Sequence, residues 1–155
     1  MLTRRIRGRV PSARPAGTGK LLGHKLMWHK ISTDGSGKCD ILATGIATDF
    51  VWGVLFEITL SDKPALDRAE GLGNGYGQKT VEIVTPSGSV NAIAYSATSI
   101  DPSLTPYTWY KSFVVAGARE HQIPTFYLTE LESVLAVPDP DQSRQARNEA
   151  LLNDG

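Results

Sequence analysis

The stretch from Leu66 to Gly77 contains the side chain best suited to acid–base chemistry. It reads Leu-Asp-Arg-Ala-Glu-Gly-Leu-Gly-Asn-Gly-Tyr-Gly, so Glu70 comes directly before a glycine-rich loop. Glycines lack the Cβ atoms that keep a backbone from bending sharply or approaching a small ligand. We therefore expect Glu70 at the rim of a pocket. The alternative is a solvated glutamate at the end of a surface helix, because most glutamates are exposed.

A helix has to position this glutamate, and the residues before it predict one. Ser61-Asp62-Lys63-Pro64 is typical of a helix start. A serine cap accepts hydrogen bonds from the first amides, aspartate suits the positive helix end, and proline is tolerated in the first turn. The apolar residues that follow recur at helical spacing: Ala65, Leu66, Ala69 and Leu72. Glu70 is thus expected in the last turn of a helix.

Composition favours a single domain of 155 residues with a real core. The 16 basic residues equal the 16 acidic ones, so no global field points to nucleic acid, membrane or a polyanionic substrate. The basic residues are nevertheless concentrated before Asp34, and a nucleic-acid-binding arm is an alternative. Because that arm has no interleaved aromatic residues, we predict no nucleic-acid partner.

The cysteine, the histidines and the apolar runs indicate which metal sites, disulfides and cellular locations to expect. The single Cys39 excludes an intrachain disulfide and a cysteine-built metal site, which fits a reducing compartment. His24 and His29 are five residues apart in an expected strand and would project to opposite faces, so we expect no metal and no cofactor. No apolar run approaches the roughly 20 residues that cross a bilayer, and the arginine-rich start lacks the apolar core of a secretion signal. We predict a cytoplasmic protein without a membrane partner.

Hydrophobic patterning predicts a mixture of strands and helices. Strands are expected over 21–32, with Leu22, Leu26 and Trp28 facing inward, over 51–58 after an apolar segment at 41–50, and as a hairpin of 79–85 and 89–98. Residues 34–38 are expected to form a tight turn, or a loop bordering the pocket.

Helices are expected over 2–10, ending near Gly8, from 106 onward with Trp109 in the core, and from 124 to about 137. Residues 1–137 would form the domain, and 138–155 a polar tail with a peripheral helix over 142–152. The Gly17-Thr18-Gly19-Lys20 run has the wrong spacing for a phosphate loop.

Seven segments follow one another in a characteristic order. They are Gly23-His24-Lys25-Leu26 with His29-Lys30, Asp34-Gly35-Ser36-Gly37-Lys38, Trp52-Gly53-Val54-Leu55-Phe56-Glu57-Ile58, Leu66-Asp67 before Glu70-Gly71, Gly75-Tyr76, Pro106-Tyr107-Thr108-Trp109-Tyr110-Lys111, and Gly117-Ala118-Arg119-Glu120-His121 with Ile123-Pro124 and Tyr127. In this order they resemble the gamma-glutamylcyclotransferase family in its bacterial, plant-defence-protein-like branch. The resemblance covers residues 1 to about 137.

The resemblance implies an α+β fold with a small, mostly antiparallel β-barrel and surrounding helices. It also implies an enzyme that converts a gamma-glutamyl amino acid or amine to 5-oxoproline and the free amine. Glu70 would be the general acid and base, and Gly71, Tyr76 and Tyr110 would bind the small-molecule gamma-glutamyl substrate. The substrate's own α-amine attacks its γ-carbonyl, so the protein need only fold the substrate and move protons. For the tyrosines, core packing with a satisfied hydroxyl is the alternative.

The sequence departs from the family at two places. The family's first strand and its Tyr-Gly-Ser-Asn loop, which helps hold the glutamyl group, would precede Met1 and are absent here. Unpaired neighbours of that strand would invite association, so a homodimer stays open. A catalytically inactive binding or scaffold member of the same fold is the alternative function. The second departure is Gly77, where the family often has an aromatic residue, and Tyr76 is expected to serve instead.

Overall fold

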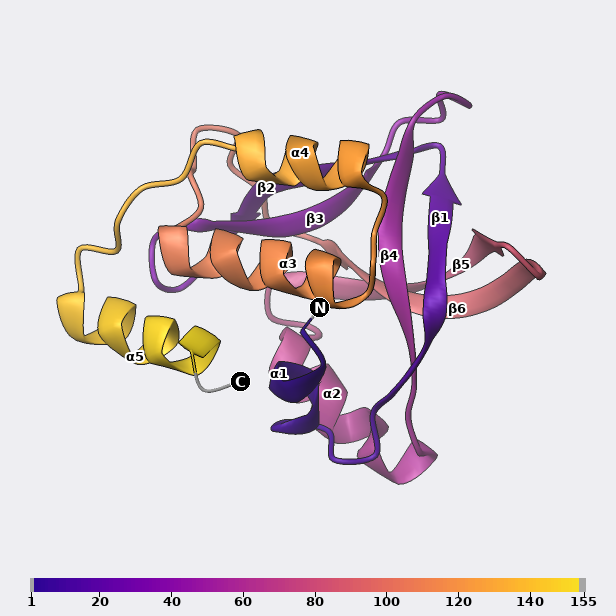
Figure 1. Cartoon of the computed structure of the whole chain (residues 1–155), viewed down its shortest axis with the longest axis horizontal. Coiled ribbons are helices and arrows are strands. Elements are labelled where there is room, and N and C mark those ends of the chain that lie inside the picture. The colour runs from indigo at the N-terminus through magenta and orange to yellow at the C-terminus, as the bar shows by residue number, and fades with distance from the viewer. Residues whose placement is uncertain (1, 154–155) are drawn as a thin grey trace.

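The computed structural model describes residues 2–153 (Figure 1). Met1, the first residue of the predicted domain, and Asp154 and Gly155, the last of the predicted tail, lie outside these residues. The elements follow in the order α1 (Thr3–Arg7), β1 (Arg14–Leu22), β2 (His24–Ile31), β3 (Gly37–Ala43), β4 (Phe50–Glu57), a 3-10 turn (Leu60–Asp62), α2 (Lys63–Glu70), β5 (Tyr76–Thr85), β6 (Gly88–Ala97), α3 (Thr108–Glu120), α4 (Thr125–Ser133) and α5 (Gln142–Asn153). This confirms the predicted α+β class.

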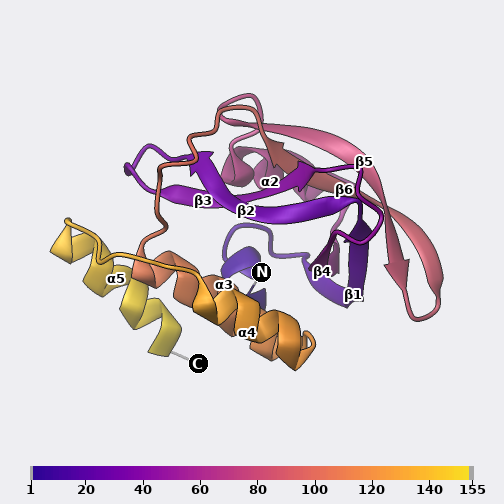
Figure 2. The ribbon, with the colours of Figure 1, turned by 90° about the horizontal axis from the view of Figure 1, so that it is seen from above.

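The strands form two antiparallel sheets that do not close into a full barrel. One sheet has the order β4-β1-β5-β6, and the other is the β2-β3 hairpin. The Ala97 amide donates to Asp40 Oδ1 over 2.7 Å and thereby joins β6 to β3. The prediction of a mostly antiparallel fold is confirmed, and the barrel is approximate. Figure 2 shows α3 and α4 along one side of the hairpin, with β5 and β6 on the other.

The predicted strand over 21–32 is wrong in its boundaries. The chain leaves one sheet for the other at Gly23, whose φ of 66° is in the left-handed region. Leu22 therefore ends β1 and is 48% exposed, whereas Leu26 and Trp28 of β2 pack against the core as predicted. Because β1 begins at Arg14, the run rejected as a phosphate loop is extended strand.

Three other predicted elements are shorter in the structure. The apolar segment 41–50 is divided, because β3 ends at Ala43 and the following loop closes onto Gly23 through the Thr44 amide. Helix α4 ends at Ser133 and not near Val137, because Val137 pairs with the start of α3 through a bridge to Tyr107. The turn predicted over 34–38 is shorter, because it ends at Ser36 and Gly37 and Lys38 begin β3. The hairpin of 79–85 and 89–98 is confirmed, with its first strand beginning earlier, at Tyr76. Among the described residues, no helix is long and apolar enough to cross a membrane.

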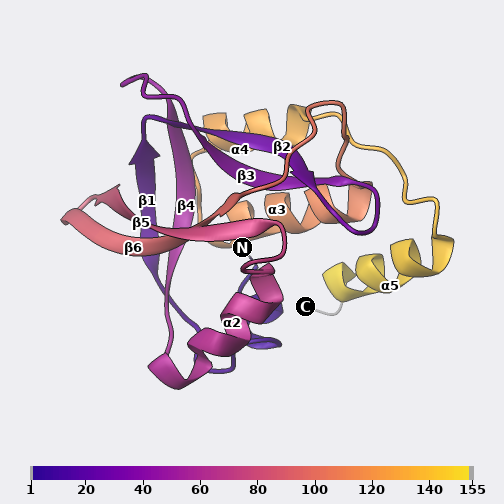
Figure 3. The same ribbon diagram turned by 180° about the vertical axis from the view of Figure 1, so that it is seen from behind.

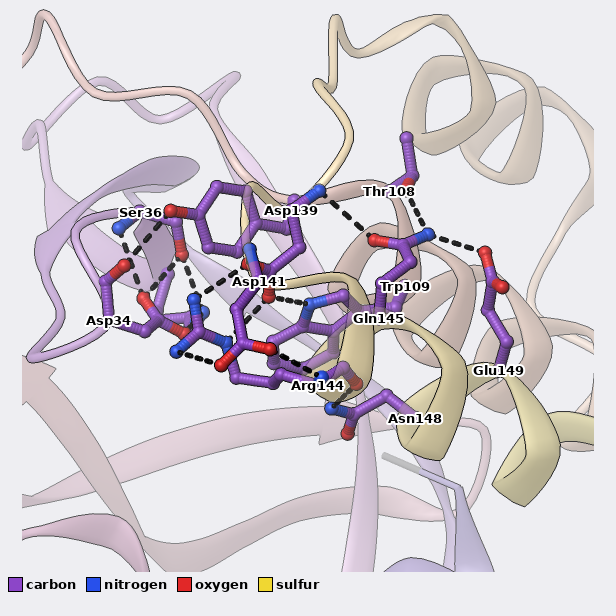
Figure 4. Close-up of polar contacts among 12 residues, drawn as sticks. Asp34, Ser36, Thr108, Trp109, Asp139, Asp141, Arg144, Gln145, Asn148 and Glu149 are labelled. Atoms are coloured by element: carbon purple, nitrogen blue, oxygen red, sulfur yellow. Dashed lines mark hydrogen bonds and ion pairs between the residues drawn. The ribbon is translucent and has the colours of Figure 1, made fainter.

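Asp139 anchors the C-terminal segment to α3 (Figure 4). Its side chain accepts a hydrogen bond from Trp109 Nε1 over 2.8 Å and two from the Arg144 guanidinium, each over 2.6 Å. Arg144, and to a lesser extent Trp109, hold the pKa of this buried carboxyl well below its usual range. The predicted helix over 142–152 is present as α5, which packs against α3.

We expect Asp139→Asn to destabilise the fold by roughly 2 kcal/mol, because charged hydrogen bonds to a buried carboxylate are lost. Since the folded pKa is lowered, this stability is present above the unfolded pKa of about 3.9 and is lost as the pH falls through the folded value. Urea unfolding near pH 7 measures the change. Asp141→Asn is the matched control, because Asp141 is 47% exposed and lies 3.8 Å from Arg144. Equal effects of the two substitutions would contradict this account.

A close backbone approach inside the hairpin requires glycine at position 37. A Cβ atom on Gly37 would lie 2.0 Å from the Trp28 carbonyl oxygen, whereas one on Gly53 of β4 would meet nothing within 4 Å. We expect Gly37→Ala to cost about 2–3 kcal/mol through overpacking. Gly53→Ala should instead stabilise the chain by about 0.5 kcal/mol, because alanine loses less entropy than glycine in a strand. Denaturant melts of the two variants check the opposite signs.

Candidate active site

Helix α2 holds Glu70 and is fixed at its start by α1 and the segment after it. Leu66 packs against the buried cluster of Ile6, Val10 and Ala13. The predicted serine cap is wrong, because the 3-10 turn runs directly into α2 and no side chain caps the helix. Asp62 instead accepts a hydrogen bond from the Ser12 amide over 3.1 Å. This bond and the cluster together set the position of α2.

Glu70 is the last residue of α2, as the sequence predicts. Gly71 follows in the left-handed conformation, with φ 81° and ψ 38°, which strains residues that carry a Cβ atom. The chain then turns through the glycine-rich loop into β5, where Tyr76 is the first residue. The structure therefore gives Gly71 a role in ending the helix, and its contact with a substrate stays a prediction.

The Glu70 carboxylate is half-buried and stands without a partner. Within residues 2–153 it forms no hydrogen bond and no ion pair. Burial raises the pKa of Glu70 above its ordinary value, while the charges of Arg9 and Arg5 partly oppose this shift. A carboxyl whose pKa is raised in this way is better suited to accept and return a proton than an exposed glutamate.

Tyr76 and Tyr110 both bond the backbone of one residue of β3, Cys39. The Tyr76 hydroxyl donates to the Cys39 carbonyl oxygen over 2.6 Å, and the Cys39 amide donates to the Tyr110 hydroxyl over 3.0 Å. Burial, with a contribution from the Cys39 thiol, raises the pKa of both phenols. The charge of Glu70 also raises the pKa of Tyr76, so the two groups lie within electrostatic reach. Tyr76 and Tyr110 are thus brought together at Cys39, and Glu70 lies within electrostatic reach of Tyr76. Each tyrosine hydroxyl has one partner, as the packing alternative requires, and the Tyr110 hydroxyl takes part only as an acceptor.

Sequence patterning does not identify Cys39 and Arg5 as neighbours of this site. Burial raises the pKa of the Cys39 thiol to about 12, so it is not a thiolate nucleophile near neutral pH. Arg5 belonged to the basic arm considered above for nucleic acid. Its guanidinium lies 4.2 Å from the centre of the Phe113 ring, which no local sequence pattern could indicate.

The two histidines of the hairpin are engaged separately. His29 Nε2 lies 2.9 Å from Asp40 Oδ2 in the interior, and His24 Nδ1 lies 2.8 Å from the Leu22 carbonyl oxygen. Across residues 2–153, no group of three histidine, cysteine or acidic side chains could hold a metal ion.

Two surface hollows lie away from Glu70 and the tyrosine pair. One of about 430 Å³ is lined by residues of β1, β2 and β5, including Leu21 and Lys79. The other, of about 360 Å³, lies between β2, the start of β4 and α4, and its Asp49 is paired with Lys25 over 3.4 Å. Neither hollow is lined by Glu70, Tyr76 or Tyr110. We place the candidate site at Glu70, because burial raises the pKa of its carboxyl.

Comparisons with known proteins agree on one family. The profile of the AIG2-like family matches residues 50–131, slightly more than half of the chain. Gamma-glutamylcyclotransferase of Bos taurus is 31% identical over 142 residues, and that of Homo sapiens is 31% identical over 143. Each alignment covers 86% of this chain and 73% of the relative. A solved structure described as gamma-glutamyl cyclotransferase superposes with a TM-score of 0.87 and 26% identity over 99% of this chain and 93% of that one.

The raised pKa of Glu70 predicts a pH-dependent stability difference for Glu70→Gln. Because the folded pKa exceeds the unfolded value of about 4.3, the stability of the protonated form is complete below that value. It is lost as the pH rises through the folded pKa. Glutamine avoids this loss, so the variant should melt at a higher temperature than wild type near pH 7 and at a similar temperature near pH 4. Thermal melts across this range measure the difference. A variant that is less stable near pH 7 would mean that the carboxylate is favourably paired.

Proposed function

This chain belongs to the gamma-glutamylcyclotransferase family, and from that premise we propose that it converts a gamma-glutamyl amino acid or amine to 5-oxoproline and the free amine. Glu70 is the general acid and base in this proposal. The observation that carries it is the unpaired, half-buried carboxylate at the end of α2, with a pKa raised by burial. No cofactor is needed for this chemistry, because the nucleophile and the electrophile belong to one substrate.

The reaction is an internal exchange of one C–N bond for another. The α-amine nitrogen attacks the γ-carbonyl carbon, which closes a five-membered lactam ring and breaks the bond to the leaving nitrogen. Glu70 takes a proton from the attacking amine and returns one to the leaving amine, so no net proton or water is consumed. A carboxyl group with a raised pKa is suited to both transfers near neutral pH.

Tyr110 and Tyr76 support this chemistry through their bonds to the backbone amide and carbonyl groups of Cys39. The Tyr110 oxygen accepts the Cys39 amide hydrogen, so the hydroxyl's own hydrogen can point to another acceptor. We assign that acceptor as the γ-carbonyl oxygen, on which negative charge develops during attack. The Tyr76 hydroxyl is already donated to Cys39, so Tyr76 would contact the substrate with its ring and hold the peptide in place. Gly71 would line the site through its backbone.

We expect Glu70→Gln to release 5-oxoproline about 10²- to 10⁴-fold more slowly than wild type, because glutamine keeps the shape of the side chain but cannot exchange the proton. The assay measures 5-oxoproline formed from a panel of gamma-glutamyl amino acids and amines. Glu57→Gln is the control, because Glu57 is an exposed glutamate at the end of β4. Circular dichroism verifies that both variants are folded. Wild-type activity in the Glu70 variant would refute its assigned role, and absence of 5-oxoproline with every substrate would refute the proposed reaction.

A further inference from the structure

Arg5 has a fixed and half-buried guanidinium with no acceptor. Its Cζ atom lies 4.2 Å from the centre of the Phe113 ring, a stacking arrangement that orients the planar group. Within residues 2–153 the Arg5 guanidinium forms no hydrogen bond and no ion pair. The side chain of Arg7, in the same helix, donates to the Ala13 carbonyl oxygen over 3.0 Å. Polar groups that are removed from water normally have hydrogen-bond partners. The five N–H donors of the Arg5 guanidinium are therefore able to bind an acceptor such as a ligand oxygen.

The packing of α1 places this guanidinium beside the candidate site. Figures 1 and 3 show α1 close to α2. Ile6 belongs to the cluster that holds Leu66 of α2, and Leu2 belongs to the cluster of Phe113 on α3. Helix α1 therefore bridges the helix that ends in Glu70 and the helix that carries Tyr110.

Arg5 interacts electrostatically with Glu70 and with Tyr110, and it forms no ion pair with Glu70 among the described atoms. Both Glu70 and Tyr110 influence the ionisation of Arg5, and the positive charge of Arg5 opposes the effect of burial on Glu70. No oxygen of Glu70 lies within 4.0 Å of the Arg5 nitrogens among the described atoms. The Arg5 guanidinium is thus close to Glu70, yet its N–H donors form no bond to the Glu70 carboxylate.

The chemistry of a gamma-glutamyl group fits this arrangement. Its α-amine and its α-carboxylate are attached to the same carbon, so an amine held at Glu70 brings the carboxylate into the same neighbourhood. A carboxylate is the ligand that a guanidinium binds best, through two parallel hydrogen bonds. Arg9 also lowers the pKa of Glu70, but Arg9 is exposed and no aromatic ring orients it. Its guanidinium therefore adds positive charge without holding two donors in a fixed direction.

We propose that Arg5 binds the α-carboxylate of the gamma-glutamyl substrate and makes the site specific for substrates in which this group is free. The inference rests on the proposed function, because it places the α-amine of that substrate at Glu70. Arg5 touches the substrate in this arrangement, while Phe113 acts through Arg5 by orienting it.

The kinetic test compares Arg5→Met, Arg5→Lys and Arg9→Gln. Methionine keeps an unbranched stem over the Phe113 ring, and we expect it to raise KM about 10- to 100-fold with kcat nearly unchanged, as expected for lost charged hydrogen bonds. Lysine keeps the positive charge but not the two parallel donors of the guanidinium, so the KM of Arg5→Lys should lie between those of wild type and Arg5→Met. Arg9→Gln should leave KM within about twofold. A matching rise of KM in Arg9→Gln would overturn the proposal, because the effect would then be one of general charge.

Substrate discrimination separates recognition from a structural role. Wild type should strongly prefer a gamma-glutamyl substrate with a free α-carboxylate over the same substrate with an α-carboxamide. Arg5→Met should turn over the two at nearly equal efficiency. Melting temperatures of all variants show whether they are folded under assay conditions. A full preference for the free carboxylate in Arg5→Met would overturn the proposal.

A binding experiment keeps this test independent of turnover. The probes are 5-oxoproline, which keeps the carboxylate, and 2-pyrrolidone, which is the same ring without it. Calorimetry should show that wild type and Glu70→Gln prefer 5-oxoproline at least tenfold, and that Arg5→Met has lost this preference. If wild type prefers 5-oxoproline through Arg5 but forms none from any substrate, the proposed reaction fails while the carboxylate site stands. If wild type shows no preference between the probes, the carboxylate site fails whatever the turnover.

Discussion

The burial of one unpartnered carboxylate is the constraint on which the rest of this structure depends. A charged group that is removed from water without a partner is unfavourable, and it persists only where the surrounding fold determines its position. Helix α2 is accordingly held on two sides. Leu66 joins the cluster of α1 and the following segment, while Asp67 accepts a hydrogen bond from Tyr95 of β6 over 2.6 Å and pairs with Lys63. Glu70, one turn further on, takes no part in these bonds.

Two adjacent residues of β3 connect the parts of the molecule that the site requires. The backbone of Cys39 donates its amide hydrogen to Tyr110 of α3 and accepts a hydrogen bond from Tyr76 at the start of β5. Asp40 bonds His29 across the hairpin and the Ala97 amide of β6. The hairpin therefore links both sheets to α3, and a shift of β3 would disturb the tyrosines and the sheet junction together.

Sequence patterning could predict what depends on neighbouring residues. The place of Glu70 at a helix end followed from the apolar spacing of α2 and from Gly71, and the hairpin of β5 and β6 followed from alternation around Pro86 and Gly88. Patterning failed where a distant contact decides the local structure. The break at Gly23 depends on which sheet each strand joins, and Ser61 bonds the Thr59 hydroxyl over 2.9 Å and does not cap α2. Arg5 could not be identified either, because its orientation depends on a ring in α3, near the other end of the sequence.

The opposing effects on Glu70 also bear on how substrate binding and proton transfer are connected. In the free protein, burial raises the pKa of the carboxyl and the charges of Arg9 and Arg5 hold it lower. A carboxylate bound to Arg5 would offset part of that positive charge and exclude water from the same region. Both changes disfavour the ionised form of Glu70, so it would become a stronger base when its substrate arrives. Departure of the product carboxylate would reverse the effect, which links the protonation of Glu70 to the occupancy of the site.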